Sequence, residues 1–407
     1  MKNKILLLLL FIFSFSALAN DYKAALDSVS SLFGKDNEKA KTHLLDLKSS
    51  YDSKGNSYWL SKSNYFLGYL YRENQEFGKA IIHYLEAIRY AEKGGFESAE
   101  KDIISIHNRC GIIFRKFKAF ELSEKYYDKG ILMASEGEYN DLLILLKYNY
   151  AGLLRETDQL KKAKNVLSST IPALEKGSDD YFDFKNRLAL THYDMGQFDK
   201  AIVIYNEIAA EVSPSNYLLG YSYHNLAKAY KAISDFNNSE KFYLLAIEVK
   251  KNKESYSSLY GYAELMIKVG RIEESLKYFK LANILVNEKD PESFKIYKVQ
   301  ADLHYNLENY ELAKKYEDLY SKNLNDFLLI QQELQEIDRQ LNLNLITKRY
   351  FDEVSKQERI ASILLYSRLI SGSLLILLLT SIGYNQYEKI RVRKNIEKQL
   401  SQLEMLD

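Results

Sequence analysis

The middle of the chain repeats one pattern of small and aromatic apolar positions. In its clearest copy, the small residues Gly68, Ala80 and Ala87 are accompanied by Tyr71 and Tyr84. The first small residues of successive copies are 43, 40, 38, 38, 36 and 38 residues apart, and a second small residue follows each by 12. The first positions are Gly68, Gly111, Ala151, Ala189, Ala227, Ala263 and Ala301. Such a regular period predicts a solenoid of helix–turn–helix units.

One physical requirement explains both small residues of each copy. They lie on the two helices of a predicted pair, where only Gly, Ala or Ser lets the backbones approach closely, and the aromatic residues fill the next groove. Asn64, Leu67, Gly68 and Tyr71 stand at the W-x-x-L-G-x-x-Y positions of the tetratricopeptide repeat. The pattern resembles that family over about residues 60–322, which implies an all-α tetratricopeptide-repeat solenoid. The Trp position, the mostly absent closing Pro and the longer period depart from it.

The array is predicted to span residues 60–325, after a degenerate capping repeat over 20–59. Ala40, Leu44 and Leu47 have the spacing of the second helix of such a repeat. From Asp326 the repeat gives way to apolar residues at steps of three and four, namely Phe327, Ile330, Leu334, Ile337 and Leu341. This spacing predicts a coiled-coil-like helical stalk over 326–367. A similar seam in the linker helix at 388–407 favours a homodimer through stalk and tail.

Both ends of the chain carry apolar segments. Residues 1–19 have the basic start, apolar run and A-x-A-like Ala17–Ala19 of a signal peptide, with an uncleaved anchor helix as the alternative. Between Leu369 and Tyr387, 19 residues carry no charge, which predicts a transmembrane helix over 368–387. Basic residues follow it, so the C-terminus is predicted to be cytoplasmic. The expectation is a single-pass protein of a bacterial inner membrane with a periplasmic array.

Composition and motifs exclude several functions. The net charge of +1 argues against nucleic-acid binding, and only 3 prolines and 17 glycines exclude collagen and turn-rich all-β folds. The single cysteine, Cys110, cannot form an intramolecular disulfide and is expected to be a small buried apolar residue. The six histidines fall in different repeats, where groove or surface positions are expected. We therefore predict no metal, no cofactor and no catalytic residues.

The predicted concave face carries candidate ligand-binding residues. They are expected to lie along the first helix of each pair, where basic side chains alternate with tyrosine, asparagine and histidine. This chemistry suits a peptide or protein ligand with acidic side chains or a terminal carboxylate, whereas ordinary solvated positions are the alternative. One helical turn before and after the first small residues lie Tyr65, Arg72, Asn108, Arg115, Tyr148, Arg155, His224 and Lys231.

The last residues, Lys398 to Asp407, resemble the helical linker that enters a diguanylate cyclase (GGDEF) domain. The predicted order of signal peptide, repeats, stalk, span and linker is similar to bacterial sensor cyclases. The resemblance implies the sensor half of a cyclic-di-GMP signalling protein, although no Gly-Gly-Asp-Glu-Phe motif occurs here and the chain is not predicted to be an enzyme. A structural scaffold that recruits periplasmic proteins and the sensor part of a histidine kinase are the alternatives. A receptor needs helical continuity from Asn325 onward, whereas a scaffold tolerates a break.

Overall fold

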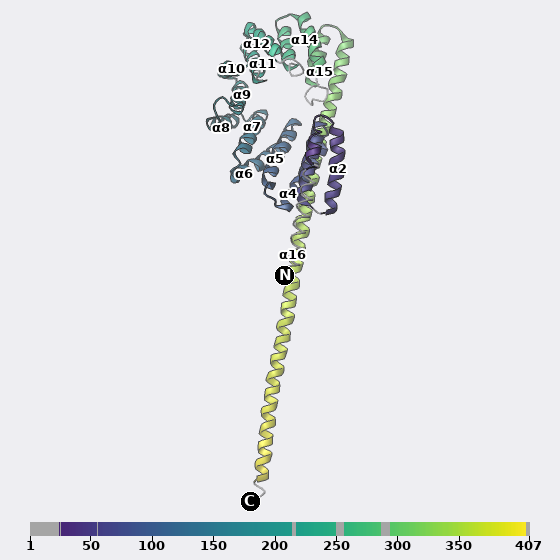
Figure 1. Cartoon of the computed structure of the whole chain (residues 1–407), viewed down its shortest axis with the longest axis vertical. Helices are drawn as coiled ribbons and strands as arrows, with labels where there is room; N and C mark the ends of the chain where they lie inside the picture. The colour runs from purple at the N-terminus through teal and green to yellow at the C-terminus, as the bar shows by residue number, and fades with distance from the viewer. Residues whose placement is uncertain are drawn as a thin grey trace. The chain divides into compact units, whose positions relative to one another are not determined.

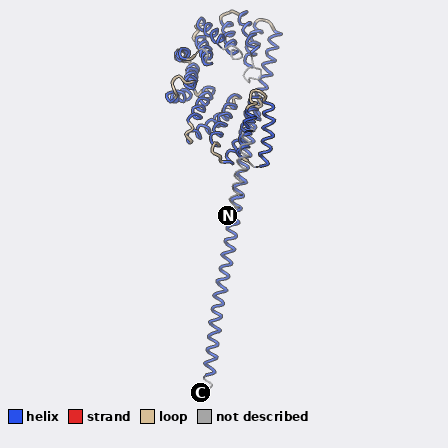
Figure 2. Tube along the Cα trace, viewed as in Figure 1, coloured by secondary structure: helices blue, strands red, loops and turns tan. Residues whose placement is uncertain are grey.

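The computed structural model describes residues 24, 26–54, 56–213, 217–249, 256–285 and 294–403. Within these ranges the regular elements are helices, as the sequence predicted (Figure 2). The chain forms two compact units, Met1–Ile337 and Asp338–Asp407. The helices are α2 (Asn37–Lys54), α3 (Ser57–Glu73), α4 (Phe77–Gly94), α5 (Ala99–Lys116), α6 (Phe120–Glu136), α7 (Asn140–Glu156), α8 (Leu160–Thr170), the short 3₁₀ turn η1 (Ile171–Ala173), α9 (Asp179–Asp194), α10 (Phe198–Glu211), α11 (Tyr217–Ala232), α12 (Phe236–Val249), α13 (Tyr256–Lys268), α14 (Ile272–Leu285), α15 (Phe294–Asn306) and α16 (Tyr310–Leu403).

In the first unit, successive helices from α3 onward pack as antiparallel pairs that follow one another along the array (Figure 1). The predicted small residues lie where the two helices of a pair meet. Where the second position is serine, its hydroxyl group donates a hydrogen bond to the backbone carbonyl oxygen of the first position. The distance between the two oxygen atoms is 2.8 Å from Ser123 to Gly111 and 2.9 Å from Ser275 to Ala263. At Gly68 a Cβ atom would collide with the ring of Tyr84. The close approach predicted from the sequence is therefore confirmed.

The turn between the two helices of each pair has one recurring conformation. Its residue with positive φ donates its backbone N–H to the carbonyl three residues earlier, as Lys118 does to Arg115 at 2.9 Å. The left-handed conformation favours glycine. Only two of the seven equivalent positions are glycine. At the other five, the stabilisation from packing the two helices together is therefore larger than the free-energy cost of the left-handed backbone conformation. These positions are Gln75, Lys118, Asp158, Gly196, Ser234, Gly270 and Glu308.

The beginning of α16 packs against the first repeats of the array. Phe327 and Leu334 belong to the same apolar core as the residues of α3, α4 and α5, and Phe294 of α15 joins them. The Phe327 ring centroid lies 5.6 Å from that of Phe117 and 5.7 Å from that of Phe294. Gln331 donates to the Phe117 carbonyl oxygen at 2.8 Å. The two ends of the array therefore share one core.

This packing shows that the apolar residues of the predicted stalk have a contact surface within the same chain. Phe327, Ile330, Leu334 and Ile337 were expected to face a second copy, but they pack against the chain's own repeats. The first compact unit extends beyond the predicted end of the array at residue 325 and includes α16 as far as Ile337, while the boundary of the repeats themselves stays a prediction. Spacing identifies an apolar helix face but not the surface that covers it. The side chain of Leu341 lies outside the described residues.

The second unit consists of the remainder of α16. Several of its described apolar side chains are exposed, including Ile363, Leu378, Leu379 and Ile382. The prediction of a membrane span at 368–387 is not supported, since no helix in the described part of the chain combines the length and apolarity that crossing a bilayer requires. The predicted signal peptide at 1–19 and the last four residues of the linker helix lie outside the described residues.

Candidate functional site

Three of the four basic residues that were predicted for the concave face form ion pairs across repeat boundaries. In each pair, a cation at the end of one first helix meets an acid on the first helix of the next repeat. These contacts offset part of the positive charge of the three residues. The pairs join Arg115 to Glu156 at 3.2 Å, Arg155 to Asp194 at 2.6 Å and Lys231 to Glu264 at 3.1 Å.

The predicted polar residues one turn earlier make a second row of contacts. Asn108 is buried and accepts a hydrogen bond from Asn149 of the next first helix at 3.0 Å. His224 lies 3.1 Å from the Ser258 hydroxyl, and the Tyr65 hydroxyl accepts from Arg109 at 2.8 Å.

Arg72 instead pairs with its neighbour Glu73 and lies over the ring of Tyr69. The structure thus places seven of the eight predicted residues in contacts between successive repeats, and their role as ligand contacts stays a prediction.

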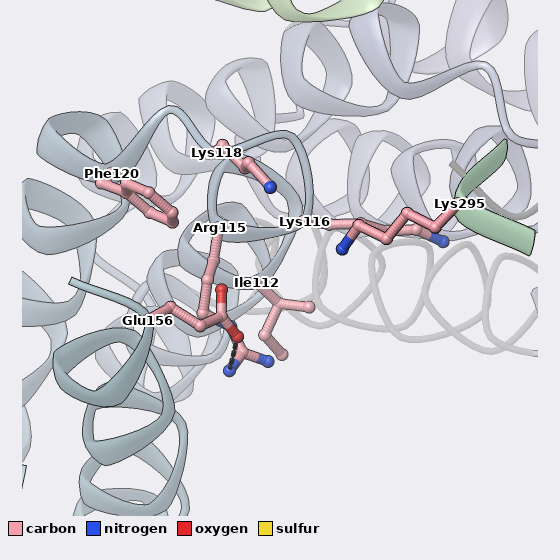
Figure 3. Close-up of a pocket in the computed structure, with 7 residues that line it drawn as sticks. All are labelled: Ile112, Arg115, Lys116, Lys118, Phe120, Glu156 and Lys295. Carbon is pink, nitrogen blue, oxygen red and sulfur yellow. Dashed lines mark hydrogen bonds and ion pairs between the residues drawn. The ribbon is translucent and has the colours of Figure 1, made fainter. Parts of the chain in front are cut away.

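A strongly basic pocket of about 470 Å³ opens at the turn between α5 and α6 (Figure 3). Arg115 and Lys116 come from the end of α5, Lys118 from the turn, and Lys295 from α15 near the other end of the array. Glu156 is the single carboxylate in the lining, beside the apolar Ile112 and Phe120. Four cations around one carboxylate create a positive potential that attracts anionic groups.

A second pocket of about 360 Å³ lies between α7, α9 and α11. Its lining contains the predicted Tyr148 and Arg155 together with Arg187, Asp183 and Tyr217. The guanidinium of Arg187 lies 3.7 Å from the centroid of the Tyr148 ring. Asp183 accepts the hydroxyl hydrogen of Tyr217 at 3.0 Å, and burial raises the pKa of this carboxyl group. Cations and aromatic rings therefore meet here, as they were predicted to on the concave face.

The cysteine and the histidines, for which the sequence predicted no chemical role, lie at positions of different burial. Cys110 is fully buried, as expected for a small apolar residue. Groove or surface positions were expected for most of the six histidines; His107 and His304 are buried, and the other four are exposed or partly exposed. Within the described part of the chain, no three metal-binding side chains lie close enough together to hold an ion.

The sequence pattern missed the residues that define the basic pocket. Lys116 and Lys118 follow Arg115 directly, so the run Arg-Lys-Phe-Lys was a visible signal. Lys295 is far away in the sequence, and only the meeting of the two ends of the array brings it to this pocket. Arg187 lies two residues before the first small residue Ala189, so the one-turn spacing did not select it.

Comparison with known proteins supports a tetratricopeptide-like solenoid. The tetratricopeptide-repeat family model matches residues 61–93 and 220–253. A TPR repeat-containing protein of Methanocaldococcus jannaschii is 30% identical over 125 residues, which span 30% of this chain and 20% of that protein.

Two solved structures are also similar. A tetratricopeptide repeat protein from Parabacteroides merdae has a TM-score of 0.54 at 14% identity, over 74% of this chain and 99% of that protein. The Rap conjugation gene regulator of the plasmid pLS20, in complex with a Phr peptide, has a TM-score of 0.50 at 16% identity, over 70% of this chain and 79% of that protein. At these identities the likeness shows the fold alone.

Proposed function

We propose that the array is a binding module for a peptide or protein segment with acidic groups. The observation that carries this proposal is the basic pocket, where Arg115, Lys116, Lys118 and Lys295 surround one carboxylate. The similar Rap regulator was solved in complex with a peptide, which supports the same class of ligand for this fold. Repeat arrays bind extended partners along their first helices. The role is one of recognition and needs no catalytic group.

The ion pair at the edge of the pocket gives a physical route for binding. The Glu156 side chain is 46% exposed, so its pair with Arg115 is partly solvated and contributes little net stability. An incoming carboxylate that replaces Glu156 would form a comparable bond to Arg115. It would also gain attraction from the three lysines of the pocket. The ligand is thus expected to bind through exchange of ion-pair partners.

Peptide capture tests this proposal. The full chain is immobilised and incubated with a pool of random octapeptides, and the bound sequences are read by mass spectrometry. We expect enrichment of peptides rich in Asp and Glu. We expect the double variant Arg72→Ala with Arg115→Ala to reduce their capture about tenfold or more, because two cations that are predicted to pair with acidic groups of the peptide are removed.

The control removes an exposed charge outside the pocket. Lys200→Gln, on the exposed face of α10, is expected to capture the same peptides as the natural chain. Capture of no peptide by the natural chain would contradict the proposed function.

We further propose that the array is a membrane-anchored, periplasmic sensor whose helix relays binding to a cytoplasmic output. The uncharged run from Leu369 to Tyr387 and the exposed apolar side chains of the second unit support anchoring. The unbroken helix from Tyr310 to Leu403 favours a receptor over a flexible scaffold. The link to cyclic-di-GMP signalling rests on the resemblance of the linker.

Alkaline extraction of bacterial membranes tests the anchor. If residues 368–387 cross the bilayer, the full chain stays in the membrane pellet after carbonate treatment, whereas a variant with Leu375→Arg and Leu378→Arg is released, because charges at the bilayer centre are costly. Release of the natural chain into the supernatant would exclude an integral anchor and leave a peripheral scaffold.

A further inference from the structure

Gly152 of α7 is the point where two arginines from neighbouring helices meet. A Cβ atom at this position would collide with the Nη1 atoms of both Arg115, from α5, and Arg187, from α9. Glycine therefore lets two guanidinium groups lie against the backbone of α7, and a Cβ atom here would displace both. Arg115 lines the basic pocket and Arg187 lines the second pocket. The two arginines at Gly152 thus belong to different pockets, each with further cations in its lining.

The two arginines differ in their partners. Arg115 has Glu156, but among the described residues no carboxylate forms an ion pair with Arg187. The Nε atom of Arg187 is buried without a hydrogen-bond partner, and the guanidinium lies over the Tyr148 ring. Burial and repulsion by Arg115 and Arg155 lower the pKa of Arg187. The attraction of Asp183 to Arg187 acts without a close ion pair, and the pKa of Arg187 stays lowered. A buried cation that is only partly neutralised costs stability, so such an arrangement is expected where a ligand supplies the anion.

The acidic groups nearby are engaged elsewhere. Asp194 is paired with Arg155, and Asp183 accepts the hydroxyl hydrogen of Tyr217 at 3.0 Å. Neither forms an ion pair with Arg187. Guanidinium groups bind carboxylates through two parallel N–H···O bonds, and a ring stacked on one face holds the fork in a fixed orientation. Tyr148 supplies that stacking for Arg187.

We propose that Arg187 and Arg115, brought together at Gly152, form a receptor for one carboxylate of the ligand. This inference rests on the proposed function, because it names the group by which an acidic peptide is anchored. Arg187 is the primary contact, since no carboxylate of the described residues lies within ion-pair distance of it and Asp183 acts on it only at longer range, and Arg115 joins when the ligand replaces Glu156. Gly152 provides the room that both side chains need.

Binding of matched peptide pools by the full chain tests the carboxylate receptor. One pool of random octapeptides keeps its acidic side chains and terminal carboxylate, and the other has the same sequences with every carboxylate converted to an amide. The natural chain is expected to capture the first pool at least tenfold better. Arg187→Gln and Gly152→Ala, which displaces the guanidinium groups without removing charge, are expected to abolish this preference.

The variants separate a binding role from a structural one. If Arg187 serves ligand binding, Arg187→Gln keeps or raises the midpoint of thermal unfolding while the carboxylate preference is lost. Asp183→Asn, a change of opposite sign in the same pocket, is expected to leave the preference intact or increase it. A lowered unfolding midpoint together with an unchanged carboxylate preference in Arg187→Gln would overturn the proposal and make Arg187 a packing residue.

Other outcomes distinguish the two proposals. Equal capture of both pools by the natural chain would overturn the carboxylate receptor and leave peptide binding in place. Capture of neither pool would overturn both. Thermal unfolding in acetate and in phosphate, each compared with chloride, identifies the oxyanion directly. A rise in the unfolding midpoint that needs Arg187 and occurs in phosphate but not in acetate would replace the carboxylate by a phosphate ligand.

Discussion

The imidazole of His107 is 7% exposed, and its Nδ1 atom has no hydrogen-bond partner among the described residues. Burial lowers the pKa of His107 from the usual 6.5 to about 4. Burial also lowers the pKa of His83 to about 4, where the ring lies 2.8 Å from the Asn64 side-chain oxygen and stacks on Tyr71. Both groups are therefore neutral in the folded array under conditions in which the unfolded chain binds protons.

The lowered pKa of His107 predicts a loss of stability in acid. Between pH 6.5 and about 4 the unfolded chain binds a proton that the folded array excludes, so the free energy of unfolding falls as the pH falls. The slope for one such group approaches about 1.4 kcal/mol per pH unit. Urea unfolding measured across this range is expected to show a shallower slope in His107→Gln.

At the scale of the element, the turn between paired helices shows a conflict between local preference and tertiary packing. Ser234 has a φ of 62°, and the equivalent Gly196 has a φ of 72°. Nothing lies within 4 Å of a Cβ atom built at Gly196, so a side chain there meets only the cost of its own backbone conformation. For residues other than glycine this cost is about 1 kcal/mol.

A reciprocal exchange measures that cost. Gly196→Ser is expected to lower the free energy of unfolding by about 1 kcal/mol, and Ser234→Gly is expected to raise it by up to the same amount, less the added entropy of the unfolded chain. Urea unfolding of both variants provides the measurement. Loss of stability in Ser234→Gly would show that the serine side chain contributes more than the turn conformation costs.

At the scale of the whole molecule, the packing of the start of α16 determines which residues line the basic pocket. It joins the first repeats to α15, and this brings Lys295 to the same pocket as Arg115 and Lys116 (Figure 3). The basic pocket is therefore a product of the contact between the ends of the array. Loss of that contact would separate its cations by the length of several repeats.

Phe327→Ala tests this contact. Removing a buried phenylalanine costs about 3–5 kcal/mol, and here the loss falls on the packing of α16 against Phe117 and Phe294. Faster hydrogen exchange is expected over residues 310–337, with the middle repeats unchanged. Leu328→Ala, one position along at an exposed site, is the matched control and should exchange as the natural chain does. Equal exchange in both variants would show that α16 is held by other contacts.

The sequence by itself determined the helical repeats of this protein. The pairs of small residues 12 positions apart require close helix contacts that only Gly, Ala or Ser permits, so Gly68, Gly111 and Ala263 are enough to identify the array. The first helix of each pair follows from the same period. Each repeat can be located from its neighbour because the separation between equivalent positions is short and nearly constant.

Only the tertiary structure decided what those positions contact. The apolar face at Phe327 and Leu334 looked like a dimer seam, but it covers the chain's own first repeats. The basic residues Arg115 and Arg155 meet acids one repeat away, and Lys295 reaches a pocket formed near the other end of the array. Helical periodicity gives the direction in which a side chain leaves the axis of its helix. The residue that this side chain then contacts depends on the curvature that accumulates over many repeats, and no local sequence pattern encodes that curvature.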